Sequence, residues 1–385
     1  MRRIERNISL VKWIYITQGL VFIAPVFMLY FGSRGLELSQ ILMLQFIFSA
    51  SSMLLEFPSG YISDKLGRKR TLVVAYASLV LAVYLFLNGV SFNTFAIAEF
   101  AFAFGYSLIS GTLSSLLFES IRVFGKEADY SKVFGNIVHK QLMTIAFAGI
   151  VGGLIAKFIS LDATVVATLL GFLASFILSL FLKEPSVVNA RGIKEDIKDF
   201  KLVFSNKELI SITIFVALIF AFNQVSFWYY QPYFQAIDVD LAYFGILFAS
   251  FQIVASIGSK YANAVMQKFT REQIFIIVSV ATVTSFVGMW WFFSYAGLIF
   301  IYLQQLVRGL FTILSSEYAH KHASDELRAT TISFMALAKK LLFAGNLYFF
   351  AQISKVVGME HIYLIMAGVL AILLVLFFVL KRVFR

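Results

Sequence analysis

Long apolar runs separated by short polar segments dominate the sequence. About 20 mostly apolar residues are needed to cross the hydrocarbon core of a bilayer, and a window of about 19 residues locates such runs. The pattern predicts twelve spans, at 10–31, 38–62, 71–89, 94–121, 135–157, 163–182, 208–235, 241–262, 273–293, 297–319, 329–352 and 358–380. The runs do not alternate strictly between polar and apolar residues, as membrane β-strands do. The predicted fold class is therefore an all-α membrane protein.

Composition narrows the function classes. Of 385 residues, 60% are hydrophobic and 14% are charged, against about 25% charged in soluble domains, which excludes a soluble enzyme with a tail anchor. The chain has no cysteine, so it has no disulfide framework and no thiol chemistry. It also has no nucleotide-binding loop, no nucleophile with a nearby base and no metal-ligand spacing. We expect no enzymatic activity, no cofactor and no metal.

The distribution of basic residues predicts the topology. With both termini cytoplasmic, the cytoplasmic segments hold 25 lysines and arginines, and the outer segments hold three, Arg34, Lys157 and Lys355. Cytoplasmic loops carry such an excess, so the net charge of +11 reflects orientation and indicates no nucleic-acid partner. The N-terminal apolar run is too long for a signal peptide and leads directly into further spans. The predicted location is a bacterial cytoplasmic membrane.

The chain divides into two similar halves. The polar segment from Lys183 to Lys207 contains a pattern typical of a short interfacial helix. The predicted parts are a six-helix bundle at 1–184, a cytoplasmic central loop at 185–206 and a second six-helix bundle at 207–385. Three matches at a nearly constant offset support a repeat: 65–68 with 268–271, 119 with 317, and 140 with 339.

The loop between the second and third spans carries a specific motif. It reads Gly60-Tyr61-Ile62-Ser63-Asp64-Lys65-Leu66-Gly67-Arg68-Lys69-Arg70, which resembles the signature of the major facilitator superfamily in the expected cytoplasmic loop. The resemblance implies two pseudo-symmetric six-helix bundles and secondary transport by alternating access. It also implies a conformational latch at the cytoplasmic helix ends, for which the candidates are Gly60, Asp64, Lys65, Gly67, Arg68, Glu119 and Glu317.

A second resemblance is partial. Gly149-Ile150-Val151-Gly152-Gly153 is similar to the end of the family's antiporter motif but lacks its proline. Close packing of helices explains the same glycines equally well. The fourth span also lacks the family's arginine followed by a Gln-Gly pair, so the proton step attributed to that arginine is not carried over.

Charged residues inside a span are costly and are functional candidates by default. At 1.5 Å per residue, Arg308, Lys339 and Lys340 lie near the bilayer midplane. By the resemblance, spans 1, 4, 7 and 10 line the central cavity, where polar stripes on spans 7 and 10 would face water. The candidate substrate-binding residues are Arg308, Lys339, Lys340, Gln18, Asn223, Gln224, Trp228 and Gln304. The alternative is that these polar residues hold helices together.

The sequence leaves open which lysine faces the cavity and what charge the substrate carries. Lys339 and Lys340 point about 100° apart on a helix, so one of them faces the cavity, and the sequence does not say which. A cationic cavity favours an anionic or zwitterionic substrate, unless buried acids neutralise the cations. Glu99 is the first candidate for proton coupling and Glu56 is the second.

These features predict a proton-coupled secondary transporter that acts as a monomer, with membrane lipids, protons and a small molecule as its partners. We expect it to export a small amphipathic anionic or zwitterionic compound, such as a drug-like molecule or a siderophore. One alternative is an importer of an anionic metabolite, since a fold does not set the direction of transport. The other is a non-transporting receptor or lipid-handling scaffold.

Overall fold

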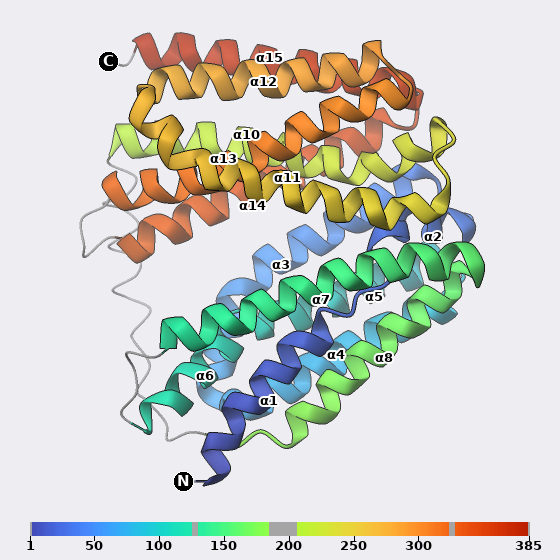
Figure 1. Cartoon of the computed structure of the whole chain (residues 1–385), viewed down its shortest axis with the longest axis vertical. Helices are drawn as coiled ribbons and strands as arrows, with labels where there is room; N and C mark the ends of the chain where they lie inside the picture. The colour runs from blue at the N-terminus through green and yellow to red at the C-terminus, as the bar shows by residue number, and fades with distance from the viewer. Residues whose placement is uncertain (1, 125–129, 185–205, 323–327, 384–385) are drawn as a thin grey trace. The chain divides into compact units, whose positions relative to one another are not determined.

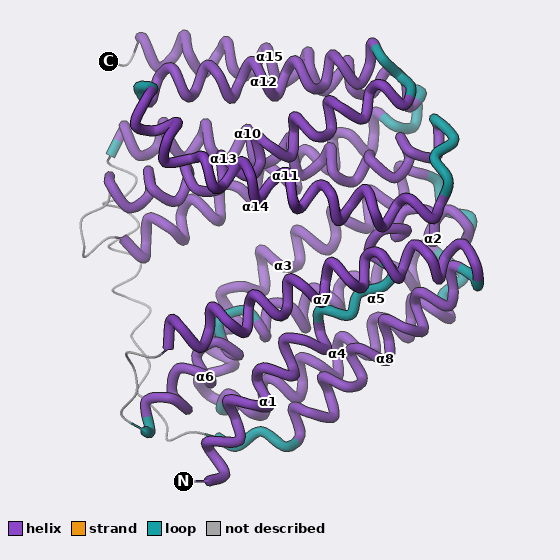
Figure 2. Tube along the Cα trace, in the orientation of Figure 1, coloured by secondary structure: helices purple, strands orange, loops and turns teal. Residues whose placement is uncertain are grey.

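The computed structural model describes residues 2–124, 130–184, 206–322 and 328–383. Every regular element among them is helical (Figure 2). In chain order they are α1 (Arg2–Gln18), η1 (Ala24–Val26), α2 (Phe27–Ser33), α3 (Leu38–Leu66), α4 (Arg68–Asn88), α5 (Phe92–Ile109), α6 (Thr112–Arg122), α7 (Tyr130–Phe158), α8 (Leu161–Leu180), α10 (Lys207–Ala236), α11 (Leu241–Lys268), α12 (Arg271–Trp291), η3 (Tyr295–Gly297), α13 (Leu298–His322), α14 (Arg328–Ile353) and α15 (Met359–Val383) (Figure 1). The interfacial helix expected in the central loop lies outside the described residues.

The helices form two compact units. The first comprises Met1–Ala190 with Asp240–Phe248, and the second comprises Arg191–Val239 with Ala249–Arg385. In the first unit α4 packs against α5 and α8, and α1 packs against α6, α7 and α8. In the second unit α10 packs against α13, α14 and α15, while α12 packs against α13 and α15. The division of the chain into domains at 184 and 207 stays a prediction.

The described part contains 11 helices that are long and apolar enough to cross a membrane, together with the short apolar stretch Ala24–Ser33. The sequence predicted twelve spans. The difference lies in the first span, predicted as one helix over 10–31, which is broken between Gln18 and Ala24 and appears as the teal stretch beyond α1 in Figure 2. The hydroxyl of Thr168 accepts a hydrogen bond from the backbone N–H of Ile23 at 3.2 Å. This side chain replaces a helical partner, as a broken span inside a membrane requires.

The fourth predicted span is also interrupted. Residues 94–121 were expected to form one helix, but α5 ends at Ile109 and α6 begins at Thr112. Gly111 between them has a φ of 79°, a conformation that glycine adopts without steric cost. In the second unit α13 runs from Leu298 to His322 without a break. Both observed breaks in the spans therefore lie in the first unit.

Short polar side chains set several helix starts. The Ser160 hydroxyl accepts from the N–H of Ala163 at 3.1 Å, and the Asn206 side chain accepts from the N–H of Leu209 at 3.1 Å. Thr270 and Gln273 form a reciprocal capping box at the start of α12. Each of these residues satisfies a backbone donor that the first helical turn leaves without an intrahelical partner.

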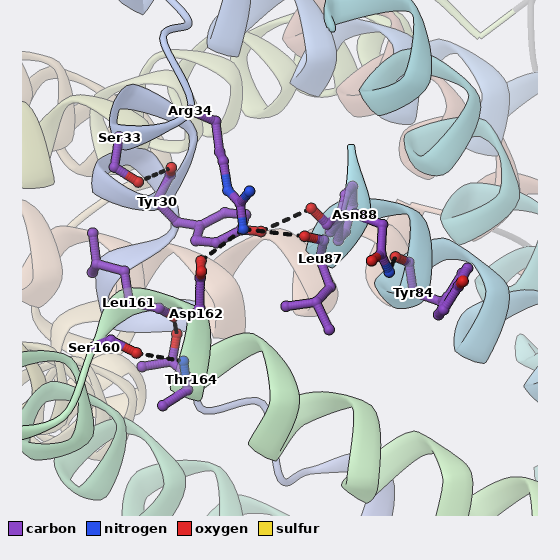
Figure 3. Close-up of polar contacts among 12 residues, drawn as sticks. Tyr30, Ser33, Arg34, Tyr84, Leu87, Asn88, Ser160, Leu161, Asp162 and Thr164 are labelled. Carbon is purple, nitrogen blue, oxygen red and sulfur yellow. Dashed lines mark hydrogen bonds and ion pairs between the residues drawn. The ribbon is translucent and has the colours of Figure 1, made fainter. Parts of the chain in front are cut away.

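One polar network anchors α2 to the ends of two other helices of the first unit (Figure 3). The guanidinium of Arg34 donates to the carbonyl of Leu87 at 3.1 Å and to the Asp162 carboxylate at 2.7 Å. It also lies 5.2 Å from the ring centre of Tyr30, whose hydroxyl donates to the carbonyl of Phe86 at 2.8 Å. The network satisfies carbonyls at the C-terminal end of α4 and holds the second part of the broken span in place.

Candidate functional site

Among the described residues of the first unit, Glu99 is the most enclosed carboxyl group. It lies on α5 with 2% of its surface exposed, and the amide nitrogen of Gln45 on α3 donates to its Oε1 at 3.0 Å. Among the described residues no lysine or arginine forms an ion pair with it. Because an ionised carboxylate is expensive to bury without a cation, this environment suits the protonated form. The sequence did not identify Gln45, although a glutamine in an otherwise apolar span is itself a signal.

Gln18 ends α1, directly before the break in the first span. It is 8% exposed, and its side-chain oxygen accepts a hydrogen bond from the hydroxyl of the fully buried Tyr76 at 2.8 Å. The oxygen is thus engaged within the first unit. Gln18 stays a predicted substrate-binding residue, and Tyr76 is a partner that sequence reasoning missed.

The second unit contains a buried polar network between α10 and α13. The side-chain oxygen of Gln304 accepts hydrogen bonds from the Ser226 hydroxyl at 2.9 Å and from the Tyr230 hydroxyl at 2.6 Å. The Tyr230 oxygen in turn accepts from the side-chain nitrogen of Gln305 at 2.9 Å. Gln304 is completely buried, so its amide orients neighbouring groups in the conformation described. The network includes Gln305, which the sequence had not singled out although it follows Gln304 directly.

Arg308 lies one helical turn beyond this network. Its Nη2 donates to the side-chain oxygen of Gln252 on α11 at 2.5 Å. Two members of the polar stripe predicted on the same helix, Thr312 and Ser315, donate to carbonyls within α13. Such bonds within a helix leave the side chain little capacity for a ligand, so Arg308 carries most of the chemistry of this stripe.

The two adjacent lysines of α14 are the next candidates for substrate binding. The Nζ of Lys339 lies 5.7 Å from the ring centre of Phe220 on α10, and α10, α13 and α14 pack together in the second unit (Figure 1). Lys340 is half-buried. Lys339 is half-buried as well. The geometry places Lys339 against the helix that carries the predicted polar stripe, and both lysines stay predicted substrate contacts.

The remaining candidates on α10 differ in exposure. Asn223 is 8% exposed and donates to the carbonyl of Ile219 in its own helix at 3.0 Å. Gln224 and Trp228 are half-buried, and the Trp228 ring meets that of Phe227 edge to face with centres 5.8 Å apart. These residues stay predicted members of a substrate site.

Two predicted latch residues of the first unit, Arg68 and Glu119, form an ion pair. The Arg68 guanidinium donates two hydrogen bonds to the Glu119 carboxylate, at 2.7 and 2.5 Å, a bidentate geometry that strengthens the pair. Together with Ser114, Ser115, Phe118, Arg122 and Tyr130, they line a pocket of about 340 Å³. The sequence predicted Glu119 as a latch candidate at the cytoplasmic helix ends, and the structure pairs it with Arg68; its function as a latch stays a prediction.

Glu184 is a further partner of Arg68 that the sequence did not reveal. Its two carboxylate oxygens accept from the backbone N–H groups of Arg68 and Lys69 at 2.7 and 2.8 Å. A carboxylate is favoured at this end of α4 because the helix dipole is positive there. Gly67 has a φ of 83°, a conformation that favours glycine, and an added Cβ would lie 3.1 Å from the Glu184 carboxylate, which would have to shift slightly.

The remaining latch and coupling candidates lie on α3 and α13. Lys65 places its Nζ 4.5 Å from the ring centre of Tyr61. Glu56 is exposed on α3 and Glu317 is half-buried on α13. Gly60 and Asp64 belong to α3, but their side chains lie outside the described part of the structure.

The glycine-rich stretch of α7 lies against two other segments of the first unit. A Cβ on Gly152 would collide with the carbonyl oxygen of Phe22, in the broken part of the first span. A Cβ on Gly245, at the start of α11, would collide with the carbonyl oxygen of Gly149. Close approach of backbones therefore accounts for Gly152 and Gly245, and the antiporter motif is not needed to explain the glycine at 152.

Comparison with a family model and with solved structures shows what this chain is similar to. The family model described as Major Facilitator Superfamily matches residues 14–345. No curated protein matches the sequence. Similar solved structures include the nucleoside transporter NupG, at 15% identity over 99% of this chain and 100% of that chain with a TM-score of 0.81. A D-xylose-proton symporter is 13% identical over 97% of this chain and 96% of that chain, with a TM-score of 0.68.

A POT family transporter, solved in complex with a thioalcohol-conjugated peptide, is also similar. It is 11% identical over 98% of this chain and 96% of that chain, with a TM-score of 0.73. The TM-scores show that these proteins share a fold with this chain. The low sequence identities leave the substrate open.

Proposed function

Because this chain belongs to the major facilitator superfamily, as the match over residues 14–345 shows, it is a multi-pass secondary transporter rather than an enzyme, and we propose that it imports a small polar solute together with protons. The transport cycle would be alternating access, in which two helical bundles rock around a substrate site. We place the protein in a bacterial cytoplasmic membrane with both termini in the cytoplasm, on the strength of its basic-residue distribution.

Import replaces the export that the glycine motif suggested. The similar solved structures include a protein described as a D-xylose-proton symporter, and close packing accounts for Gly152 without an antiport function. Export and antiport find no support in the comparisons. The alternative of import, which the sequence also allowed, is the better supported direction.

The observation that carries the proton coupling is the enclosure of Glu99. Its carboxyl is 2% exposed and its described partner is the neutral amide of Gln45. A carboxyl in such a place holds a proton while enclosed and releases it when the transport cycle brings water or a cation to it. This two-state behaviour is what a coupling site needs. Glu56 is exposed on α3 and ranks second for this role.

The second unit supplies the groups suited to the solute. Arg308 and Lys339 are cations within spans, and the glutamines near Arg308 offer both donors and acceptors. A carboxylate, phosphate or carbonyl oxygen on the solute would bind the guanidinium, while the amide groups of the glutamines would form hydrogen bonds with the other polar atoms of the solute. We therefore assign substrate contact to Arg308 first and to Lys339 second, with Asn223, Gln224 and Trp228 as further contacts from the second unit. Gln18, in the first unit, stays a predicted substrate contact.

The test is solute uptake by the purified protein in proteoliposomes under an imposed proton gradient. With one proton per neutral solute, a membrane potential of 100 mV supplies about 2.3 kcal/mol, which corresponds to roughly 50-fold accumulation. A protonophore should abolish accumulation. Glu99→Gln should lose accumulation but keep exchange of solute between the two sides, while Glu360→Gln, which changes an exposed carboxyl at the start of α15, should behave as wild type.

Each contrary result has a distinct meaning. Accumulation that survives the protonophore contradicts proton coupling. Proton-driven loss of preloaded solute would restore the export hypothesis. If no solute moves in any arm while ligands still bind, the protein acts as a receptor or scaffold.

A further inference from the structure

Gln304, Gln305 and Arg308 lie on one face of α13, since residues three and four apart on a helix are neighbours. The hydroxyl of Tyr230 on α10 lies between the two glutamines, 2.6 Å from the oxygen of Gln304 and 2.9 Å from the nitrogen of Gln305. All four residues belong to the second unit. The directions of their hydrogen bonds determine which end of each amide is available to a ligand.

The network orients Gln304 first. Its nitrogen donates to the sulfur of Met289 at 3.2 Å, so its oxygen faces the hydroxyls of Ser226 and Tyr230 and accepts from both. Tyr230 has a single O–H proton, which is committed to Gln304. The Tyr230 oxygen can then only accept from its other neighbour, and that neighbour must present a donor.

Gln305 is oriented as a consequence. Its nitrogen donates to the Tyr230 oxygen, so its own carbonyl oxygen must point away from this hydroxyl. The Gln305 side chain is 3% exposed, and its oxygen accepts no hydrogen bond from any residue in the described part of the chain. A buried acceptor without a partner is unfavourable, and a rigidly held one is suited to reading a donor on a ligand.

Arg308 follows Gln305 by three residues, which is one turn of α13. Its Nη2 is engaged by Gln252, and a guanidinium carries five N–H donors in a planar fork. One turn of helix therefore presents a fixed acceptor beside a cation with donors to spare. A ligand complementary to both carries a hydrogen-bond donor next to an oxygen acceptor or an oxyanion.

We propose that Gln305 is a specificity-determining residue that accepts a hydrogen bond from an N–H or O–H group of the solute, adjacent to the carbonyl or carboxylate that Arg308 binds. The solute class is thus an imide, such as a ring N–H beside a carbonyl, or a hydroxy acid. A simple anion without a donor is disfavoured, because its lone pairs would face the carbonyl oxygen of Gln305. This inference rests on the proposed transport function.

The experiment measures proteoliposome uptake of two pairs of probes. Uridine is compared with 3-methyluridine, which lacks the imide N–H, and lactate is compared with 2-methoxypropanoate, which lacks the hydroxyl proton. In the wild type we expect a preference of at least tenfold in kcat/KM for the donor-bearing member of one pair. The pair that shows it identifies the solute as an imide or a hydroxy acid.

Gln305→Met should bring that ratio close to one, chiefly by raising KM for the donor-bearing probe. The matched control is Tyr363→Phe, which removes another buried oxygen of the second unit that lacks a partner among the described residues; it should leave the ratio unchanged. If Gln305→Met does not fold, Tyr230→Phe tests the same idea, because it removes the hydroxyl that orients Gln305 and should lower the ratio.

Three results decide the matter. A ratio that Gln305→Met leaves intact overturns the proposal and indicates that the Gln305 oxygen is satisfied by an internal water. Proton-dependent uptake of another solute, with neither probe pair transported, overturns the solute class and leaves the transport function standing. Absence of proton-dependent transport for every solute overturns the proposed function itself.

Discussion

Replacing Gly152 by alanine tests the packing of α7 against the broken first span. The new Cβ would collide with the carbonyl oxygen of Phe22 and lie 2.9 Å from its carbonyl carbon and 3.1 Å from its Cα. All three atoms belong to the backbone, so no side chain can rotate away. The segments must separate, and overpacking of this kind costs about 1–3 kcal/mol.

Gly149→Ala is the matched control. The two glycines lie one turn apart on α7, and a Cβ on Gly149 would meet nothing within 4 Å. Both substitutions gain the same helix propensity, about 0.5–1 kcal/mol, which cancels in the comparison. The difference between the two variants therefore reports the collision with Phe22 alone.

The assay is thermal unfolding of both variants in one detergent at one heating rate. A difference of about 1–3 kcal/mol lowers the midpoint of Gly152→Ala by roughly 2–12 °C relative to Gly149→Ala, for a unit of this size. Equal midpoints would refute the reasoning, because they would mean that α7 does not approach the backbone of Phe22. Uptake should fall in the same variant, since the break holds Gln18 in position.

Three further predictions concern charged groups. Glu119→Gln weakens the bidentate pair with Arg68 and should lower the free energy of unfolding by about 1–3 kcal/mol, measured by denaturant titration; an unchanged midpoint would exclude a structural role for the pair. The pKa of Asp240 lies below its ordinary value because Lys157 donates a hydrogen bond to its carboxylate. The pair therefore stabilises the fold fully above about pH 3.9, the ordinary pKa of an aspartate. This stabilisation is lost as the pH falls through the lowered pKa. In a pH series of melting temperatures, Asp240→Asn should therefore match the wild type only at the acid end. Lys339→Met should raise KM for an anionic solute about tenfold or more by removing a partner charge, and an unchanged KM in uptake assays would remove Lys339 from the substrate site.

The local pattern of the chain was sufficient for most of the fold. Apolar runs predicted the spans to within a few residues, because the length of an apolar helix is set by the bilayer and not by its neighbours. The predicted and observed spans agree closely at α8 and α12, which occupy Leu161–Leu180 and Arg271–Trp291. The motif at 60–70 indicated the family that the comparison over residues 14–345 establishes.

The breaks in the first and fourth spans were beyond sequence reasoning. Local signals exist at both breaks, Pro25 at the first and Ser110-Gly111 at the fourth. However, α10 continues through Pro232 without a break, so such residues alone do not decide where a helix ends. The first break is stabilised by Thr168, and the backbone at Phe22 meets Gly152, more than a hundred residues further along the chain. Only a long-range contact can compensate a backbone that leaves the helix inside a membrane.

For the candidate site, too, the sequence and the tertiary structure determined different features. The sequence alone determined that this protein has twelve apolar runs, an excess of basic residues in alternate connecting segments, and rare charges such as Glu99 and Arg308 within its spans. The tertiary structure decided which groups those charges meet: Gln45 for Glu99, Gln252 for Arg308, and Phe220 for Lys339. Helical periodicity reports the direction of a side chain on its own helix, whereas its partner depends on how helices distant in sequence pack together.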